Sequence, residues 1–205
     1  RELFADTPRL GAVCFKVTWP GTDRVRDWVH RRPASAADTR FPTYEITEGA
    51  VAWRRQALQD VGLYREDFFI SHEGLDLALR LLEGGWEIVH DGRVQVGHAH
   101  AAGGRKSWRR YYYDTRNLFW IAVLHLPPRD AWPYLGRGVG AMLVYSLRDR
   151  HLLAWLRAVR DGVAGSRRLR RERRTLSAAT RAYLKECDRH RPGFWTLALK
   201  RLRQK

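Results

Sequence analysis

The sequence predicts an α/β fold that continues into a basic, mostly helical region toward its C-terminal end. Residues 9–17 are rich in apolar and β-branched side chains, and residues 93–96 alternate polar with apolar side chains, so both are predicted to be strands. Between them, the apolar residues that follow Glu73 recur at helical spacing. With 44% hydrophobic residues and nine Trp among 205 residues, the chain can bury a core, which excludes disorder throughout.

The predicted helix that begins near Glu73 carries two acids and a base along one edge. Glu73, Asp76 and Arg80 fall at positions i, i+3 and i+7, so their side chains share one side of the helix. Such a helix can direct carboxylates into a cleft. The alternative is a surface helix with an Asp76–Arg80 pair, which contributes only about 0.3 kcal/mol. The apolar residues of the inward face are Leu75, Ala78, Leu79 and Leu82.

The apolar stretches between Leu118 and Leu147 predict two helices and no membrane span. Pro127-Pro128-Arg129-Asp130 interrupts the apolar run, and neither part reaches the roughly 20 residues that a spanning helix needs. Aromatic residues such as Trp120 and Trp132 suit two settings equally, a membrane interface or an ordinary core.

Positive charge is concentrated in the last part of the chain. Residues 150–205 contain 17 Lys and Arg against 4 Asp and Glu, a net charge of +13 within the +16 of the whole chain. Arginines that interleave with apolar residues favour an anionic membrane surface as partner. A nucleic-acid surface or a solvated basic tail would have a similar composition, and no specific nucleic acid is expected. The cysteines, Cys14 and Cys187, lie far apart without a C-x-x-C pattern, which predicts neither a disulfide framework nor a zinc site and favours a cytoplasmic location.

Residues 48–98 contain a series of short motifs in a fixed order. In this order and at these spacings, the motifs resemble the second half of a family 2 glycosyltransferase of the GT-A fold. The Tyr-Tyr-x-x-x-Arg-Asn pattern at residues 111–117 is similar to the stretch that follows the His in bacterial members. The motifs are Gly49-Ala50, the Arg-Arg to Val-Gly segment 54–62, Phe68-Phe69, the acidic helix from Glu73 to Arg80, Gly84-Gly85 and the strand that ends on His98.

The resemblance implies sugar transfer from a nucleotide-sugar donor to a glycan or lipid-linked acceptor in envelope polysaccharide synthesis, at the inner face of the plasma membrane. Glu73 or Asp76 would bind or deprotonate the acceptor hydroxyl. His98 would hold a divalent metal, Mn²⁺ or Mg²⁺, with the diphosphate of the donor. The remaining expected binding residues are Gly49 and Ala50, which would leave room for the donor, Phe68 and Phe69, which would line the acceptor site, and Arg80.

One residue departs from the family pattern. The residue after the first Glu of the acidic helix is usually the Asp that serves as general base, and this chain has Gly74 there. Glycine cannot accept a proton, so either Glu73 or Asp76 replaces the base, or the chain is a catalytically inactive module that binds membrane or partner proteins. A weaker alternative is a basic nucleic-acid-binding protein.

The nucleotide-binding half of a GT-A enzyme has no counterpart in the residues before Thr47. No strand, Gly-rich turn and helix follow one another there, and no Asp-x-Asp motif is present. We therefore expect an amino-terminally truncated sequence. Residues 1–106 would form a partial GT-A domain, and residues 107–205 a helical, basic region that can associate with membranes.

Overall fold

The computed structural model of the chain describes residues 2–99 and 107–190. These residues form two compact units that alternate along the chain. The sheet unit contains residues 2–60, 84–99 and 178–190, and the helical unit contains residues 61–83 and 107–177. The end of the helical region predicted for 107–205 lies outside the described residues.

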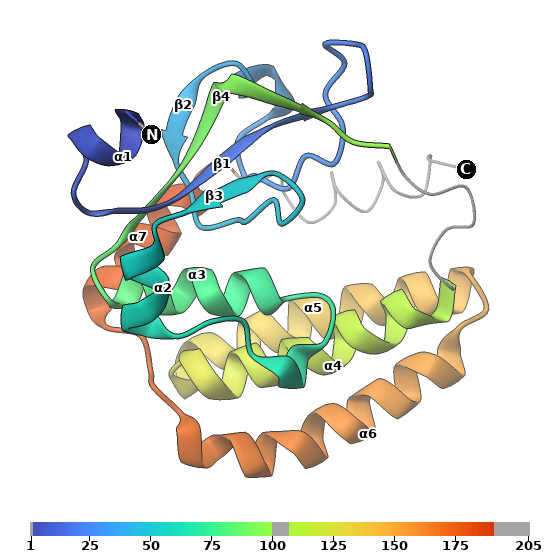
Figure 1. Cartoon of the computed structure of the whole chain (residues 1–205). Coiled ribbons are helices and arrows are strands. Elements are labelled where there is room, and N and C mark those ends of the chain that lie inside the picture. The colour runs from blue at the N-terminus through green and yellow to red at the C-terminus, as the bar shows by residue number, and fades with distance from the viewer. Residues whose placement is uncertain (1, 100–106, 191–205) are drawn as a thin grey trace. The chain divides into compact units, whose positions relative to one another are not determined.

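The sheet unit contains a mixed sheet of four strands, which confirms the α/β class. The strands are β1 (Leu10–Thr18), β2 (Arg40–Pro42), β3 (Val51–Trp53) and β4 (Glu87–Gly97), and their order is β2-β4-β1-β3. The two long strands, β1 and β4, run parallel side by side, whereas β2 and β3 pair antiparallel to their neighbours (Figure 1). Leu10, Val13 and Val89 form a buried apolar cluster of this unit.

Strand β1 matches the strand predicted at residues 9–17 to within one residue at each end. Strand β4 is longer than the predicted strand at 93–96, because its first half is buried on both sides and shows no alternation of polar and apolar residues. Gly92 lies within it, and a Cβ there would come within 2.1 Å of the carbonyl oxygen of Ala37. A glycine is therefore required where the chain at Ala37 passes close to β4.

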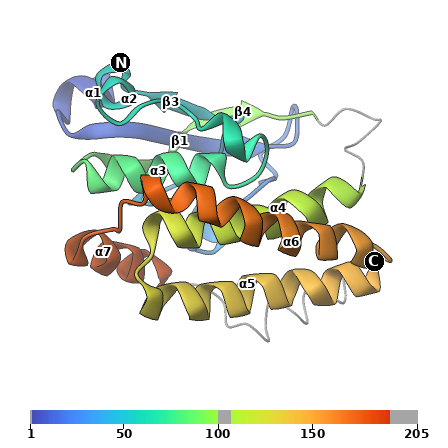
Figure 2. The same cartoon turned by 90° about the horizontal axis from the view of Figure 1, so that it is seen from below.

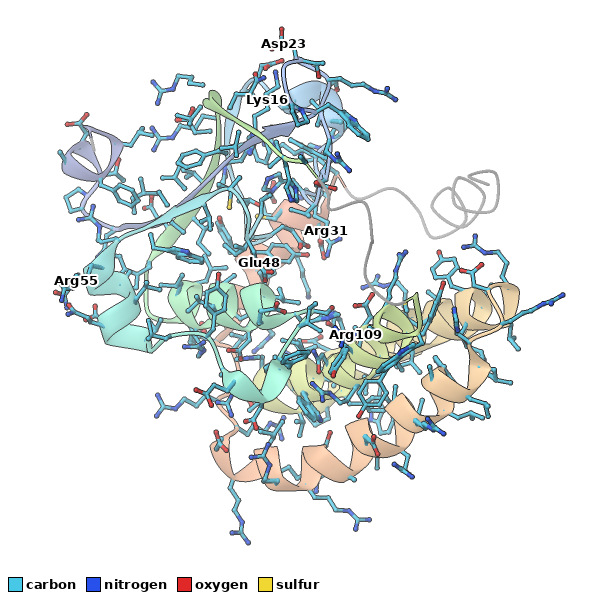
Figure 3. All side chains as sticks on the ribbon, turned by 45° about the vertical axis from the view of Figure 1, so that its right-hand side comes forward. Lys16, Asp23, Arg31, Glu48, Arg55 and Arg109 are labelled. Atoms are coloured by element: carbon cyan, nitrogen blue, oxygen red, sulfur yellow. The ribbon has the colours of Figure 1, made fainter. Side chains whose placement is uncertain are left out.

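Among its described residues, the sheet unit also contains four helical elements. They are α1 (Glu2–Asp6), η1 (Ala34–Ala36), α2 (Arg55–Val61) and α7 (Ala178–Asp188). Arg31, labelled in Figure 3, pairs with Glu45 at 2.5 Å and with Asp188 of α7 at 3.1 Å. The hydroxyl of Tyr44 donates to the same Asp188 carboxylate at 2.6 Å, so α7 is anchored to the segment that follows β2.

The helical unit is built on three long helices that lie side by side in Figure 2. These are α4 (Ser107–His125), α5 (Pro128–Arg148) and α6 (Leu152–Leu169), and the shorter elements are η2 (Glu66–Phe68), α3 (Glu73–Glu83) and η3 (Arg170–Glu172). Glycines let the long helices approach closely: Gly138 of α5 faces Leu118, and Gly162 of α6 faces Phe119. The core cluster between α4 and α5 consists of Tyr111, Leu118, Met142 and Tyr145.

The two helices predicted between Leu118 and Leu147 are confirmed. Helix α4 ends at His125 and α5 begins at Pro128, where a proline suits the first helical position because the amide hydrogen it lacks would have no helical partner. Trp120 is buried in the helical unit, whereas Trp132 is exposed. None of the helices in the described part of the chain is long and apolar enough to cross a bilayer.

Candidate functional site

The loop between η2 and α3 has an unusual backbone. Phe69, Ser71 and His72 have φ angles of 61°, 70° and 66°, in the left-handed region that residues other than glycine rarely adopt. Each such residue costs about 1–3 kcal/mol, and the strain persists only where surrounding contacts impose it. Strained residues of this kind cluster at functional sites, which makes this loop a candidate functional site.

Two side chains of α4 hold this loop by its backbone. The Asn117 amide donates to the carbonyl oxygens of Phe68 (3.2 Å), Ile70 (2.9 Å) and Ser71 (2.6 Å), and it is fully buried. Arg116 donates to the carbonyl oxygens of Asp67 (3.0 Å) and Phe68 (2.9 Å). We call Arg116 and Asn117 the loop clamp.

The loop clamp is itself fixed in an aromatic setting. The Arg116 guanidinium lies 4.0 Å from the ring centre of Trp120 and 4.9 Å from that of Tyr113, which favours the cation over the ring faces. In the sequence, Arg116 and Asn117 stand out only through the Tyr-Tyr-x-x-x-Arg-Asn pattern that carries part of the family resemblance.

Asp76 is the centre of a buried ion-pair network. One carboxylate oxygen accepts from His125 Nε2 at 2.8 Å, and the other accepts from Arg80 at 2.9 and 2.8 Å. Burial alone would raise the pKa of Asp76, but the hydrogen bonds from His125 and Arg80 outweigh it and hold that pKa below its usual range. The Asp76–Arg80 pair expected as the surface alternative therefore forms, with its carboxylate fully buried.

Arg80 also joins α3 to the segment before it. Its guanidinium donates to the carbonyl oxygens of Val61 (2.5 Å), Gly62 (3.1 Å) and Leu63 (2.8 Å). All the contacts described for Arg80 are thus internal to the helical unit and position α3.

Glu73 is the first residue of α3 and follows the strained loop directly. Its side chain is half-buried, and its Oε2 atom is buried without a hydrogen-bond partner in the structure. A buried carboxylate oxygen without a donor is rare in folded proteins, because the group loses its water without compensation. Such an oxygen is able to accept a hydrogen bond from a bound hydroxyl group.

The two phenylalanines of the predicted acceptor site differ in exposure. Phe68 is fully buried and packs edge-on against Trp120 with ring centres 5.8 Å apart, so it has no surface to offer a ligand. Phe69 is 65% exposed and lies 5.3 Å from the ring of Tyr113.

Two further residues of the loop, which sequence reasoning did not select, lie next to Glu73. The Nδ1 atom of His72 and the hydroxyl of Ser71 are 2.8 Å apart and share a hydrogen bond. Burial lowers the pKa of His72, while the carboxylate of Asp114 on α4 acts in the opposite direction. The imidazole is therefore neutral at neutral pH.

The other expected site residues belong to the sheet unit. His98 follows the end of β4, as predicted, and its Nδ1 lies 2.8 Å from Asp27 Oδ2. A carboxylate in this position orients an imidazole, as it does for histidines that bind metals. Ala50 is buried, whereas Gly49 is exposed and a Cβ there would meet open space.

A divalent metal needs more ligands than this neighbourhood supplies. Within residues 2–99 and 107–190, no three His, Cys, Asp or Glu side chains gather as a metal-binding group. One imidazole beside one carboxylate does not make a ligand set that fits Mn²⁺ or Mg²⁺, which prefer several oxygen ligands. The metal therefore stays a prediction from the resemblance.

The expected site residues thus fall into two groups. Phe68, Phe69, Glu73, Asp76 and Arg80 lie together in the helical unit, and Gly49, Ala50 and His98 lie in the sheet unit. Within the first group, Phe69 has an exposed side chain and Glu73 has a buried oxygen without a hydrogen-bond partner, and the others stabilise the fold around them. Comparisons with protein-family models, curated proteins and solved structures gave no match, so function is argued from this site.

Proposed function

We propose that the chain contains the acceptor side of a GT-A, family 2-like glycosyltransferase, which transfers a sugar from a nucleotide-sugar donor to a glycan or lipid-linked acceptor of the cell envelope. The observation that carries the proposal is the clamped, strained loop, which ends on a carboxylate with an unpartnered buried oxygen. The motif order of the sequence supplies the reaction class.

The site residues divide into ligand contacts and supports. Transfer with inversion requires a group that accepts a hydrogen bond from the acceptor hydroxyl while its oxygen attacks the anomeric carbon. Glu73 is suited to this contact because its Oε2 has no other partner. Phe69 offers an exposed aromatic face for the apolar side of a sugar ring. Asp76 and Arg80 would hold α3 in place and not touch the substrate.

The proposal is tested with the full-length protein and a panel of nucleotide sugars, by measuring nucleoside diphosphate release in the presence of envelope glycolipid extract. Glu73→Gln should lower turnover by about 10²-fold or more if its carboxylate contacts the reacting hydroxyl. Glu66→Gln is the matched control, because Glu66 is an exposed glutamate of the adjacent η2. Unchanged turnover in Glu73→Gln would sink the assignment.

A second function, binding to an anionic membrane surface, is favoured by the outer face of α6. This face combines exposed apolar side chains with exposed arginines at helical spacing, the pattern of helices that lie in the membrane interface. Its residues are Leu153, Leu156, Arg157, Arg160, Val163 and Arg167. Such binding would keep the protein at the inner face of the plasma membrane.

Vesicle co-sedimentation tests the α6 outer face. We expect the protein to bind phosphatidylglycerol-containing vesicles and to lose affinity when Leu153 and Leu156 are both changed to Glu, since apolar insertion and charge attraction are then both weakened. Phosphatidylcholine vesicles are the control lipid. Equal binding of the variant, or preferential binding of duplex DNA over anionic vesicles, would contradict a membrane role for this face.

A further inference from the structure

The proposed function leaves the proton of the acceptor hydroxyl without a clear destination. Gly74 occupies the position where the family that the sequence resembles has the Asp that serves as general base. Both oxygens of Asp76 are engaged by His125 and Arg80. Of the two acids of α3 predicted for this role, Glu73 alone has an oxygen without a partner, and it is the side chain best placed to hold the hydroxyl. The next side chain along the strained loop is His72.

The position of His72 is imposed from several sides. Its φ angle of 66° is left-handed, the carbonyl oxygen of the preceding Ser71 accepts from Asn117 at 2.6 Å, and its own carbonyl oxygen accepts from the Asp76 amide at 2.8 Å. The ring is oriented in turn by the 2.8 Å hydrogen bond between Nδ1 and the Ser71 hydroxyl. Backbone and ring of His72, the residue that precedes Glu73, are therefore held in a fixed position, as catalytic geometry requires.

We propose that His72 is the general base of the transfer and accepts the acceptor proton at Nε2, while Glu73 holds the acceptor hydroxyl. The inference rests on the proposed function and deepens it, since it assigns the base to a residue that replaces the missing carboxylate at Gly74.

The electrostatic setting of His72 suits this role. Burial favours the neutral ring, which has a lone pair to accept a proton. If Nδ1–H donates to Ser71, the lone pair is on Nε2. The charged group that acts on the ring is the Asp114 carboxylate of α4, which has Arg110 at 3.8 Å. This carboxylate would stabilise the imidazolium that forms during transfer.

The step balances without a further reactant. The acceptor oxygen forms a bond to the anomeric carbon of the donor sugar. The bond from that carbon to the diphosphate oxygen breaks, and its electron pair leaves with the nucleoside diphosphate. The acceptor proton moves to His72 Nε2 and passes to solvent after product release.

The first test needs no substrate. In ¹⁵N-labelled protein, long-range ¹H–¹⁵N correlation spectra report the tautomer of each imidazole, and His72→Gln identifies the His72 signals among the eight histidines. At pH 7 we expect a neutral ring with the proton on Nδ1. A ring protonated on Nε2, or on both nitrogens, would overturn the proposal, because Nε2 could then accept no proton.

The second test is kinetic. With the donor panel described above, His72→Gln should lower turnover by about 10²–10⁴-fold and remove the acidic limb of the pH–rate profile that the wild type shows, while the affinity for the donor is unchanged. His190→Gln is the matched control, since His190 is exposed two residues beyond the end of α7.

The outcomes separate the two proposals. If the wild type transfers no sugar, the proposed function fails. If the wild type and His190→Gln are active and His72→Gln keeps both its rate and its acidic limb, the assignment of the base fails alone. If circular dichroism shows that His72→Gln is unfolded, Ser71→Ala identifies the His72 signals instead, because the shared hydrogen bond is then lost. The tautomer of His72 in the wild type then tests the assignment of the base.

Discussion

At the scale of single residues, Asp76 has the spacing expected of a catalytic carboxylate, but its contacts stabilise the fold. Its position three residues after Glu73 suggested a pair of catalytic carboxylates, yet both of its oxygens are engaged inside the helical unit. Ion pairs of this kind stabilise mainly by avoiding an unpaired buried charge.

Replacing Asp76 with Asn should therefore destabilise the protein more than it alters any chemistry. The half-buried Arg80 would lose its counter-charge, and Arg80 and the buried His125 would be left with one acceptor oxygen between them, which costs about 3 kcal/mol of unfolding free energy. Urea denaturation measures this, with Asp60→Asn on the exposed surface of α2 as the control. A change below about 0.5 kcal/mol would show that the network contributes little, as is usual for surface substitutions.

At the scale of elements, the packing of α6 on α4 depends on the absence of side chains. A Cβ at Gly162 would lie 2.6 Å from Phe119 Cδ2 and 3.2 Å from the carbonyl oxygen of Arg116. The carbonyl belongs to a residue of the loop clamp, so displacement of the α4 backbone at this point would also disturb the strained loop.

Gly162→Ala and Gly136→Ala should have opposite effects, although both exchange a helical glycine. Alanine favours a helix over glycine by about 1 kcal/mol. At Gly136 of α5 a Cβ meets open space, so this gain should appear as increased stability. At Gly162 the clash with Phe119 and backbone should exceed the gain and lower stability by about 1–2 kcal/mol. Urea denaturation midpoints measure both changes in stability. A Gly162→Ala variant that is more stable than the wild type would contradict close packing of α6 on α4.

At the scale of the whole molecule, buried imidazoles make stability depend on pH. His30 and His90 lie in the sheet unit with ring centres 4.7 Å apart, and one nitrogen of each ring is buried without a partner. Burial and the neighbouring His90 lower the pKa of His30 from 6.5 to about 3, and burial also lowers the pKa of His90.

Because these pKa values are depressed in the folded state, the unfolded chain binds more protons below pH 6.5. Stability should be greatest above pH 6.5. As the pH drops toward 3, His30 should lower it by about 1.4 kcal/mol per pH unit, and His90 should add a loss of the same sign. Denaturation midpoints between pH 7 and 4 measure the slope, and His30→Gln should reduce it. An unchanged slope in that variant would assign the acid sensitivity to other groups.

Local patterns predicted much of the fold and less of the site. The strand at 9–17, the helix start at Glu73 and the break at Pro127 follow from local composition, and all three are confirmed. The loop clamp could not be predicted from local patterns, because Asn117 contacts carbonyl groups 46 to 49 residues earlier in the chain. The same holds for His125, which meets Asp76 across 49 residues and turns an expected surface pair into a buried one.

The loop clamp binds the loop through main-chain oxygens, and this separates the shape of the loop from the side chains it presents. Asn117 and Arg116 bond the carbonyl oxygens of residues 67, 68, 70 and 71, so the Phe69 side chain, which is mostly exposed, takes no part in these bonds. Exchange of Phe69 could therefore change which acceptors are recognised at little cost to folding. If the proposed function holds, selectivity could diversify at this position, by evolution or by engineering, while Glu73 and His72 keep their places.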